Sequence, residues 1–362
     1  GDVYKRQALH RVRRGEPLVL SHVLILLVSL VVLVKSADWF VEFAGRAARR
    51  LGVSDLIIGL TITSVGTSLP ELASSVSASA SGYSALAVGN VVGANIANIG
   101  LIMGAAAIVR PFATSQRMHD RDGFVMVASA ALLFLSVLDN ELSQMEAIAF
   151  LLIYLGYIVF AAQTDREETE ARFADFMEFF FDLDRARTFV HRRLRRRKGD
   201  SAQELEVTRA KPSGGRSRLV LEVVAATLSC AAVVVSARFL VEEAVWAAAQ
   251  LGLPENLIGL TLIALGTTQP ELVIAITAAR RGNGDMVVGN VMGSNIANVL
   301  LVLGLAGSVR PLDVPESSVV QTIPMLIFFS LGLLYMVKSN WRVTRRQGLV
   351  ALACYAAFIV VA

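Results

Sequence analysis

Residues 51–111 and 251–311 are two copies of one sequence, which align without an insertion and are identical at nearly half of their positions. Two motifs recur in both copies: Asn-Ile-Ala-Asn at 95–98 and 295–298, and Val-Arg-Pro at 109–111 and 309–311. A copy of this length is a duplicated domain rather than the unit of a solenoid. The chain must therefore fold as two related halves.

The duplication lies within long apolar segments. Of the 362 residues, 54% are hydrophobic and 18% are charged, against about a quarter charged in soluble domains. Apolar runs of about 20 residues can cross a bilayer as helices. We expect ten spans: 18–44, 53–79, 84–109, 123–139, 143–162, 219–248, 255–279, 285–309, 317–337 and 347–362.

This count divides the chain into four parts: an N-terminal tail (1–17), a five-helix repeat (18–162), a charged linker (163–218) and a second five-helix repeat (219–362). Because five is an odd number, the second repeat must enter the membrane from the opposite side. We predict an all-α polytopic membrane protein with ten transmembrane helices in two inverted-topology repeats of five. Secondary transporters are typically built in this way.

Basic residues predict the orientation, because cytoplasmic loops carry most Lys and Arg. Loops on the side of the linker are basic, whereas those on the other side are neutral or acidic apart from Arg310. The basic tail 1–17 is an exception. We expect a multi-pass protein of the prokaryotic inner (plasma) membrane, with the N-terminus outside and linker 163–218 in the cytoplasm.

Glu71 and Glu271 occupy equivalent positions of the two copies, each directly after a proline inside an apolar segment. A carboxylate at this depth costs roughly 3 kcal/mol or more unless it is compensated, so it usually marks an ion or proton path. A structural ion pair is the alternative, but neither span holds a Lys or Arg at similar depth. We therefore expect one shared site between the repeats.

Candidate oxygen ligands surround both glutamates. Pro70 and Pro270 should break their helices and free nearby backbone carbonyl groups. The candidate ligands are the carbonyls of Ser64 and Ala264, the hydroxyls of Thr67, Ser68, Thr267 and Thr268, and the amide oxygens of Asn98 and Asn298. Carboxylates with neutral oxygens suit a hard cation such as Ca²⁺. Taken singly, each hydroxyl could instead bond to the preceding helical turn.

Gly-Thr-Ser-Leu-Pro-Glu ends at Glu71 and Gly-Thr-Thr-Gln-Pro-Glu ends at Glu271, and each is followed 22 residues later by Gly-Ala/Ser-Asn-Ile-Ala-Asn. These motifs resemble the two alpha-repeats of the cation/calcium exchanger superfamily, and most closely those of prokaryotic sodium/calcium exchangers. The resemblance implies an antiporter that exchanges Ca²⁺ for Na⁺ by alternating access. It implies no cofactor besides the transported ions. The sequence shows no HExxH motif, nucleotide loop or catalytic pairing, so we do not expect an enzyme.

The resemblance also implies roles for individual residues. Thr67, Glu71, Thr267 and Glu271 would form the Ca²⁺ site. Flanking Na⁺ sites would be completed by Ser68, Thr268, Ser294 and the carbonyls of Ser64 and Ala264, with Asn98 and Asn298 in the middle. Ala94 stands where the family often has the serine that Ser294 retains, which removes one ligand from a flanking site.

Three alternatives stay open. Some relatives carry Asp at the position of Asn298, which is linked with potassium dependence or altered proton handling, so Asn298 favours a potassium-independent exchanger. A Ca²⁺/H⁺ antiporter would have the same architecture, and a cation channel is a more distant candidate. We expect a functional monomer surrounded by membrane lipid, with no nucleic-acid partner.

The linker holds an acidic and aromatic segment, 173–183, followed by a polybasic run at 192–198. One interpretation is an interfacial helix with a basic arm held to anionic lipid. The other is a solvated linker whose charge determines only the topology. Asp38 and Arg238, at equivalent repeat positions, could pair with each other or act separately.

Protons should compete with metal ions for the two glutamates, because a protonated carboxyl group binds no metal. We therefore expect exchange to slow as the pH falls from about 8 to about 5, measured as initial Ca²⁺ flux in proteoliposomes. A rate that stays constant over this range would contradict the assignment of both glutamates to the site.

Overall fold

The computed structural model describes residues 19–51, 68–164, 173–181 and 216–361. The first repeat comprises α2 (Val19–Arg50), α5 (Leu69–Ala80), α6 (Ser84–Ala97), η2 (Asn98–Met103), α7 (Gly104–Val109), β1 (Phe112–Ala113), α8 (Gln116–Met118), η3 (His119–Gly123), α9 (Phe124–Ser136), β2 (Glu141–Leu142) and α10 (Gln144–Thr164). The linker contributes α11 (Phe173–Phe181).

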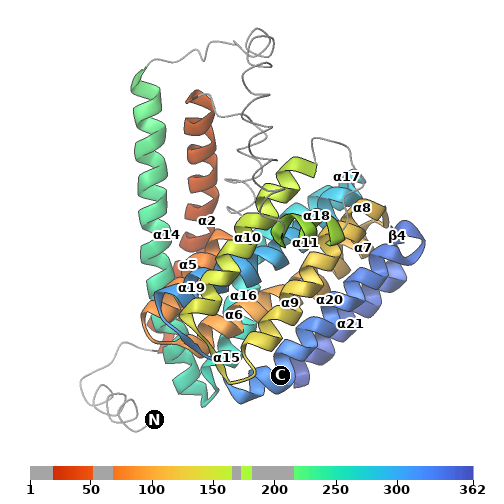
Figure 1. Cartoon of the computed structure of the whole chain (residues 1–362). Helices are drawn as coiled ribbons and strands as arrows, with labels where there is room; N and C mark the ends of the chain where they lie inside the picture. Colours follow the sequence, from red (N-terminus) through yellow and green to blue (C-terminus); the bar gives the residue numbers. More distant parts are fainter. Residues whose placement is uncertain (1–18, 52–67, 165–172, 182–215, 362) are drawn as a thin grey trace.

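The second repeat follows the same order (Figure 1). It comprises α14 (Arg216–Leu251), α15 (Glu255–Ile258), η4 (Gly259–Ile263), α16 (Ala264–Thr267), α17 (Gln269–Arg281), α18 (Gly284–Ala297), η5 (Asn298–Leu303), α19 (Gly304–Val309), β3 (Leu312–Asp313), η6 (Ser318–Thr322), α20 (Ile323–Lys338), η7 (Ser339–Trp341), β4 (Arg342–Val343) and α21 (Arg345–Val361). The turns η2 to η6 are π-helical and η7 is a 3₁₀ turn.

The all-α membrane fold is confirmed. Within the described residues, six helices are long and apolar enough to cross a membrane, or seven if a bent pair counts as one span. Each predicted span contains helix, although most of span 53–79 lies outside the described residues. Helices α2 and α14 are longer than predicted, because their polar ends continue the helix beyond the apolar segment.

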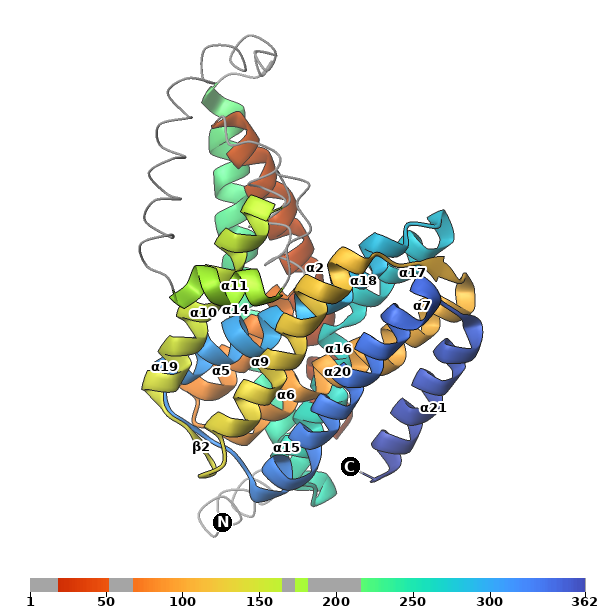
Figure 2. The ribbon, with the colours of Figure 1, turned by 45° about the vertical axis from the view of Figure 1, so that its right-hand side comes forward.

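The inversion of the repeats is visible in α2 and α14, the first helix of each half. They lie side by side and extend beyond the other helices (Figures 1 and 2). His22 Nδ1 lies 2.7 Å from Glu243 Oε2, and Arg50 Nε lies 2.6 Å from Glu222 Oε2. The start of each helix therefore meets the end of the other. Equivalent helices that run antiparallel require the two repeats to enter the membrane in opposite directions.

Two short strand pairs join the repeats at opposite ends of the bundle. Strand β1 pairs antiparallel with β4, and β2 pairs antiparallel with β3. The β4 end is labelled in Figure 1 and the β2 end in Figure 2. A residue before proline favours extended backbone, and Arg110, before Pro111, has φ −155° and ψ 122°. The extended residue before the proline leads into β1, and each strand of one repeat pairs with a strand of the other repeat.

The repeated Val-Arg-Pro motif closes a hairpin of the opposite repeat. Arg110 Nη1 donates to the carbonyl of Arg280 at 2.9 Å, beside Gly282 with φ +78°. In the mirrored position, the guanidinium of Arg310 lies against Gly82, with φ +85°. This contact with Gly82 gives Arg310 a packing role. It explains why one basic residue lies at the end of the bundle whose other loops are neutral or acidic.

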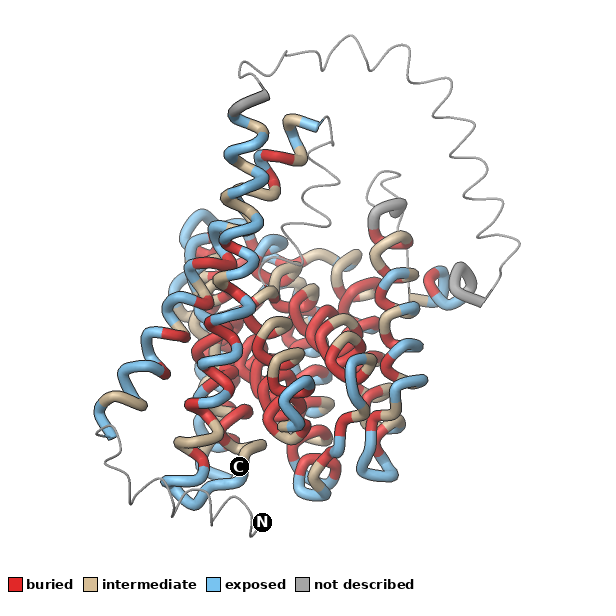
Figure 3. Tube along the Cα trace, turned by 90° about the vertical axis from the view of Figure 1, so that its left-hand side faces the viewer, coloured by how far each residue is buried: buried red, intermediate tan, exposed pale blue. Residues whose placement is uncertain are grey.

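The centre of the bundle is the most buried part of the fold (Figure 3). Every residue of α6 except Ala85 is buried. A helix that is apolar on all sides needs neighbours on all sides. Gly89 and Gly93 bring α6 onto the backbone of the 255–267 segment, because an added Cβ would lie 2.3 Å from the Asn256 oxygen and 2.2 Å from the Leu260 oxygen.

The possible pairing of Asp38 with Arg238 is not observed. Lys35 Nζ lies 3.8 Å from Asp38, and Arg238 Nε lies 3.0 Å from Glu242. Each charge is therefore neutralised within its own helix, three or four residues away.

Gly93→Ala should destabilise the protein by about 1–3 kcal/mol, because the new methyl group would overlap a backbone oxygen that cannot move freely. The matched control is Gly332→Ala in α20, where an added Cβ meets no described atom within 4 Å. We expect a lower melting temperature in detergent for the first variant and an equal or higher one for the second. Equal melting of Gly93→Ala and wild type would contradict the close packing.

Candidate cation site

Glu71 and Glu271 lie in the first turns of α5 and α17 and are 0% and 1% exposed. The predicted helix break is confirmed in the second repeat, where Glu255–Thr267 and Gln269–Arg281 meet at 48°. Thr268, at the break, has φ −80° and ψ 6°. In the first repeat Ser68 has a similar conformation, φ −89° and ψ 12°. Both carboxylates therefore sit at helix N-termini, whose dipoles favour negative charge.

The other predicted site residues divide into two groups. Ser64 and Thr67 lie outside the described residues. The rest are buried: Ser68, Asn98, Ala264, Thr267, Thr268, Ser294 and Asn298.

Each glutamate lies on a helix that packs against the other repeat. Helix α16, which ends at Thr267, packs against α5, which carries Glu71. Helix α5 packs against η5, which begins at Asn298, and α17 packs against η2, which begins at Asn98. The two halves thus contribute equivalent groups to one central region.

A set of exchanged hydrogen bonds joins the repeats at this centre. Asn98 Nδ2 donates to Asn295 Oδ1 at 3.0 Å, and Asn298 Nδ2 donates to Asn95 Oδ1 at 2.9 Å. Asn95 Nδ2 also donates to the Asn295 carbonyl at 3.1 Å, and the reciprocal bond is 3.4 Å. Because the nitrogens of Asn98 and Asn298 are held by these bonds, their amide oxygens are left for another partner.

Six buried oxygens of this region accept or donate no hydrogen bond among the described residues: Ser68 Oγ, Glu71 Oε1 and Oε2, Asn98 Oδ1, Glu271 Oε2 and Asn298 Oδ1. An unpaired buried polar atom costs about 1–3 kcal/mol, and more when it is charged. No third His, Cys, Asp or Glu joins the two glutamates within the described part of the chain. Two carboxylates with neutral oxygens form a ligand set for a hard cation.

The Ala264 carbonyl differs from the prediction, because the helix break does not leave it free. It accepts the Thr268 amide at 3.1 Å, the Thr268 hydroxyl at 2.9 Å and the Thr267 hydroxyl at 3.3 Å. A cation at this carbonyl would have to replace these donors.

Asn95 and Asn295 were not among the predicted site residues. Asn95 and Asn295 precede Asn98 and Asn298 by three residues, which places each pair of asparagines on one helix face. This spacing was the feature of the sequence from which their place beside the site could have been predicted. Each π-helical turn begins at the second asparagine of the motif, and such turns are frequent at functional sites.

Gln269, which stands where the first repeat has Leu69, donates to the Leu265 carbonyl at 2.8 Å across the break.

Comparisons with known proteins show which proteins the chain resembles in sequence and in fold. The family model for sodium/calcium exchanger proteins matches residues 21–163 and 221–362. The sodium/calcium exchanger MaX1 of Methanosarcina acetivorans is 42% identical over 347 residues, 93% of this chain and 97% of MaX1. The inner membrane protein YrbG of Escherichia coli is 31% identical over 309 residues, 85% of this chain and 86% of YrbG.

A solved structure of the sodium-calcium exchanger NCX_Mj, soaked with 2.5 mM Na⁺ and 0.1 mM Ca²⁺, is also similar. It has a TM-score of 0.58 and 26% sequence identity, and the match covers 95% of this chain and 99% of NCX_Mj.

Asn295→Ala should weaken cation binding, because Asn98 loses the acceptor that holds its amide nitrogen. Loss of a residue that orients a ligand typically costs about 10–100-fold in metal affinity. Asn283→Ala is the control, since the Asn283 side chain caps α18 by accepting the Met286 amide and lies outside the candidate site. Ca²⁺ titration calorimetry of both variants would check this, and an unchanged affinity in Asn295→Ala would contradict the orienting role.

Proposed function

The chain belongs to the sodium/calcium exchanger protein family, and we propose that it exchanges Ca²⁺ for Na⁺ across the membrane at the site between Glu71 and Glu271. The observation that carries this proposal is the group of buried, unpaired oxygens contributed by both repeats. Two carboxylates balance one Ca²⁺ or two Na⁺ without leaving an uncompensated charge in a medium of low dielectric constant. The ions therefore compete for one set of ligands.

Within this site, Glu71, Glu271, Thr67 and Thr267 hold Ca²⁺. Ser68, Thr268 and Ser294, with the carbonyl of Ser64, complete flanking Na⁺ sites. Asn98 and Asn298 supply amide oxygens between them. Ala94, on buried α6, offers no hydroxyl where Ser294 does, so the two flanking sites differ by one ligand.

The burial of both glutamates supports a carrier rather than a channel or an enzyme. Glu71 and Glu271 are 0% and 1% exposed, so an ion bound between them is enclosed by protein rather than held in an open pore. An empty site leaves two carboxylates that repel each other in low dielectric, which disfavours crossing without an ion. Exchange is therefore obligatory.

Helices α2 and α14 are suited to slide as a pair along the rest of the bundle. Such sliding would expose the site first to one side of the membrane and then to the other. These helices contact each other through ion pairs near both ends. Many of their apolar residues are exposed, among them Leu24, Val28, Val31, Leu228 and Val235. A pair that packs mainly on itself can slide along the remaining helices at small cost.

The orientation is proposed from the charges at the two ends of the bundle. Exposed residues at the β1–β4 end include Arg110, Arg280, Arg281, Lys338, Arg342, Arg345 and Arg346. Those at the β2–β3 end include Asp139, Glu141, Asp313 and Glu316. Basic residues collect on the cytoplasmic side. We therefore assign linker 163–218 to the cytoplasm and the N-terminus to the outside of the prokaryotic plasma membrane, with one chain sufficient for the site.

Glu71→Gln and Glu271→Gln should each abolish Ca²⁺ uptake driven by a Na⁺ gradient in proteoliposomes whose proton gradient is clamped. Each change removes one of the two charges that balance Ca²⁺. Glu42→Gln is the matched control, because Glu42 is exposed and pairs with Arg46 in its own helix.

Retained uptake in Glu71→Gln would remove this residue from the site. If wild-type flux ignored the Na⁺ gradient and followed a proton gradient, the protein would be a Ca²⁺/H⁺ antiporter. Flux without any counter-ion would indicate a channel.

A further inference from the structure

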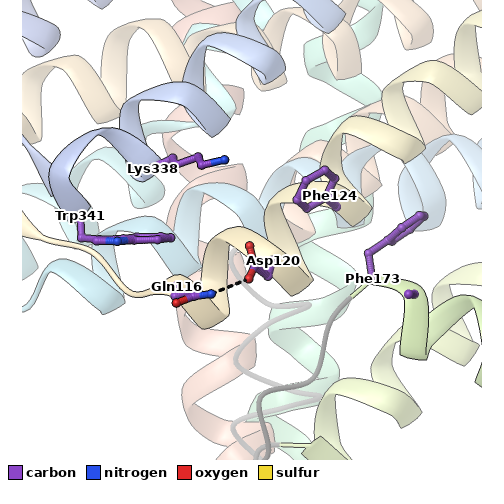
Figure 4. A pocket seen from close by; sticks show the side chains of 7 residues that line it. Gln116, Asp120, Phe124, Phe173, Lys338 and Trp341 are labelled. Atoms are coloured by element: carbon purple, nitrogen blue, oxygen red, sulfur yellow. Dashed lines mark hydrogen bonds between the residues drawn. The ribbon is translucent and has the colours of Figure 1, made fainter.

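A surface cavity of about 500 Å³ lies at the β1–β4 end of the bundle, apart from the cation site (Figure 4). Three parts of the chain meet there: the start of the fourth span in the first repeat, the linker helix α11, and the end of α20 with η7. The lining residues are Gln116, Asp120, Phe124, Phe173, Ala174, Lys338 and Trp341. Neither repeat alone forms this cavity.

The lining combines aromatic walls with one available positive charge. Phe124 stacks on Phe173 with ring centroids 6.4 Å apart. Asp120 is already engaged, since Gln116 Nε2 donates to it at 3.1 Å and His119 Nδ1 lies 2.6 Å from it. Lys338 is exposed and has no ion pair among the described residues. The cavity therefore suits a molecule with a negative group and an apolar part.

The backbone at Trp341 is strained in a way that places the indole ring in this cavity. Trp341 has φ +49° and the preceding Asn340 has φ +53°. Bulky residues rarely adopt this region, and such strain clusters at ligand sites. The Trp341 carbonyl accepts the Thr114 amide at 2.9 Å, and its ring meets His119 edge-on. Contacts with the first repeat thus hold this conformation.

Helix α20 connects the cavity to the membrane-facing surface. Phe328, Leu331, Tyr335 and Lys338 are all exposed. Their spacing of three, four and three residues places them on one helix face. An apolar stripe that ends in lysine is typical of the boundary between acyl chains and headgroups, where long basic side chains reach the phosphate layer.

Further positive charge lies beside the cavity. Arg342, Arg345 and Arg346 are exposed and follow Trp341 directly. Two of these arginines stand in the first turn of α21, where the helix dipole disfavours cations. Thr344 and Gln347 cap that turn, with Thr344 Oγ1 2.9 Å from Gln347 Oε1. The capping satisfies backbone donors, and these arginines have no ion pair with any residue that the structure describes.

We propose that this cavity binds one anionic phospholipid of the adjacent leaflet, with its phosphate at Lys338 and its chains along the exposed face of α20. The aromatic rings of Phe124, Phe173 and Trp341 enclose the glycerol region. The lipid joins the linker helix to both repeats. The polybasic run 192–198, one interpretation of which was an arm held to anionic lipid, lies outside the described residues.

The test uses the full-length protein in vesicles whose acyl chains carry bromine on either phosphatidylglycerol or phosphatidylcholine. Bromine quenches a neighbouring indole. A double variant, Trp39→Phe with Trp246→Phe, keeps Trp341 as its one tryptophan, so its fluorescence reports on this residue alone. If the double variant folds poorly, the difference in fluorescence between wild type and Trp341→Phe gives the same signal. We expect phosphatidylglycerol to occupy the site in preference to phosphatidylcholine.

Lys338→Gln should reduce this preference about fivefold, the contribution of one basic side chain near an anionic surface. Lys35→Gln, in α2, should leave it unchanged. Equal quenching by both lipids, or an unchanged preference in Lys338→Gln, would overturn the proposal. Displacement of phosphatidylglycerol by millimolar inorganic phosphate would also overturn it, because the occupant would then be a soluble anion.

Discussion

The structure depends on the cost of holding two carboxylates at the centre of a membrane protein. Glu71 and Glu271 are almost completely buried and have no ion-pair partner among the described residues. Their mutual repulsion rises as water is excluded. Among the described residues the fold supplies helix N-termini, amide oxygens and hydroxyls but no positive side chain beside the glutamates. A bound cation, or a proton in its place, would supply the compensation, and this competition is the physical basis of the exchange that we propose.

Inverted duplication explains how one chain builds such a site. Equivalent residues from opposite directions face one another, and the hydrogen bonds are exchanged between halves: Asn98 to Asn295, and Asn298 to Asn95. The same exchange recurs at both ends, where each strand pairs with the other repeat. The strand pairs and the asparagine bonds thus each have a counterpart in the other half, although the two ends of the bundle differ in charge. Ala94 and Ser294, at equivalent positions, are a departure from this symmetry, and in the proposed site they distinguish the two flanking positions.

The sequence predicted those features that are local to one segment. Proline after a polar turn predicted the break at Thr268, and the two glutamates in apolar runs are buried, as their depth in the predicted spans requires. The asparagine exchange, the strand pairs and the contact of Arg310 with Gly82 were missed, because each joins residues about 200 positions apart. A pattern in one segment carries no information on its partner. The Ala264 carbonyl was expected to be free for a related reason, since the rotamers of Thr267 and Thr268 cannot be read from their spacing.

Diffraction from crystals soaked in Ca²⁺, recorded at a wavelength where Ca²⁺ scatters anomalously, would show whether both repeats hold the ion. We expect one strong central peak with carboxylate oxygens of both Glu71 and Glu271 at about 2.3–2.6 Å, joined by neutral oxygens from both repeats. A peak held by the carboxylate of one repeat alone, or a calcium ion elsewhere in the protein with this centre empty, would contradict it.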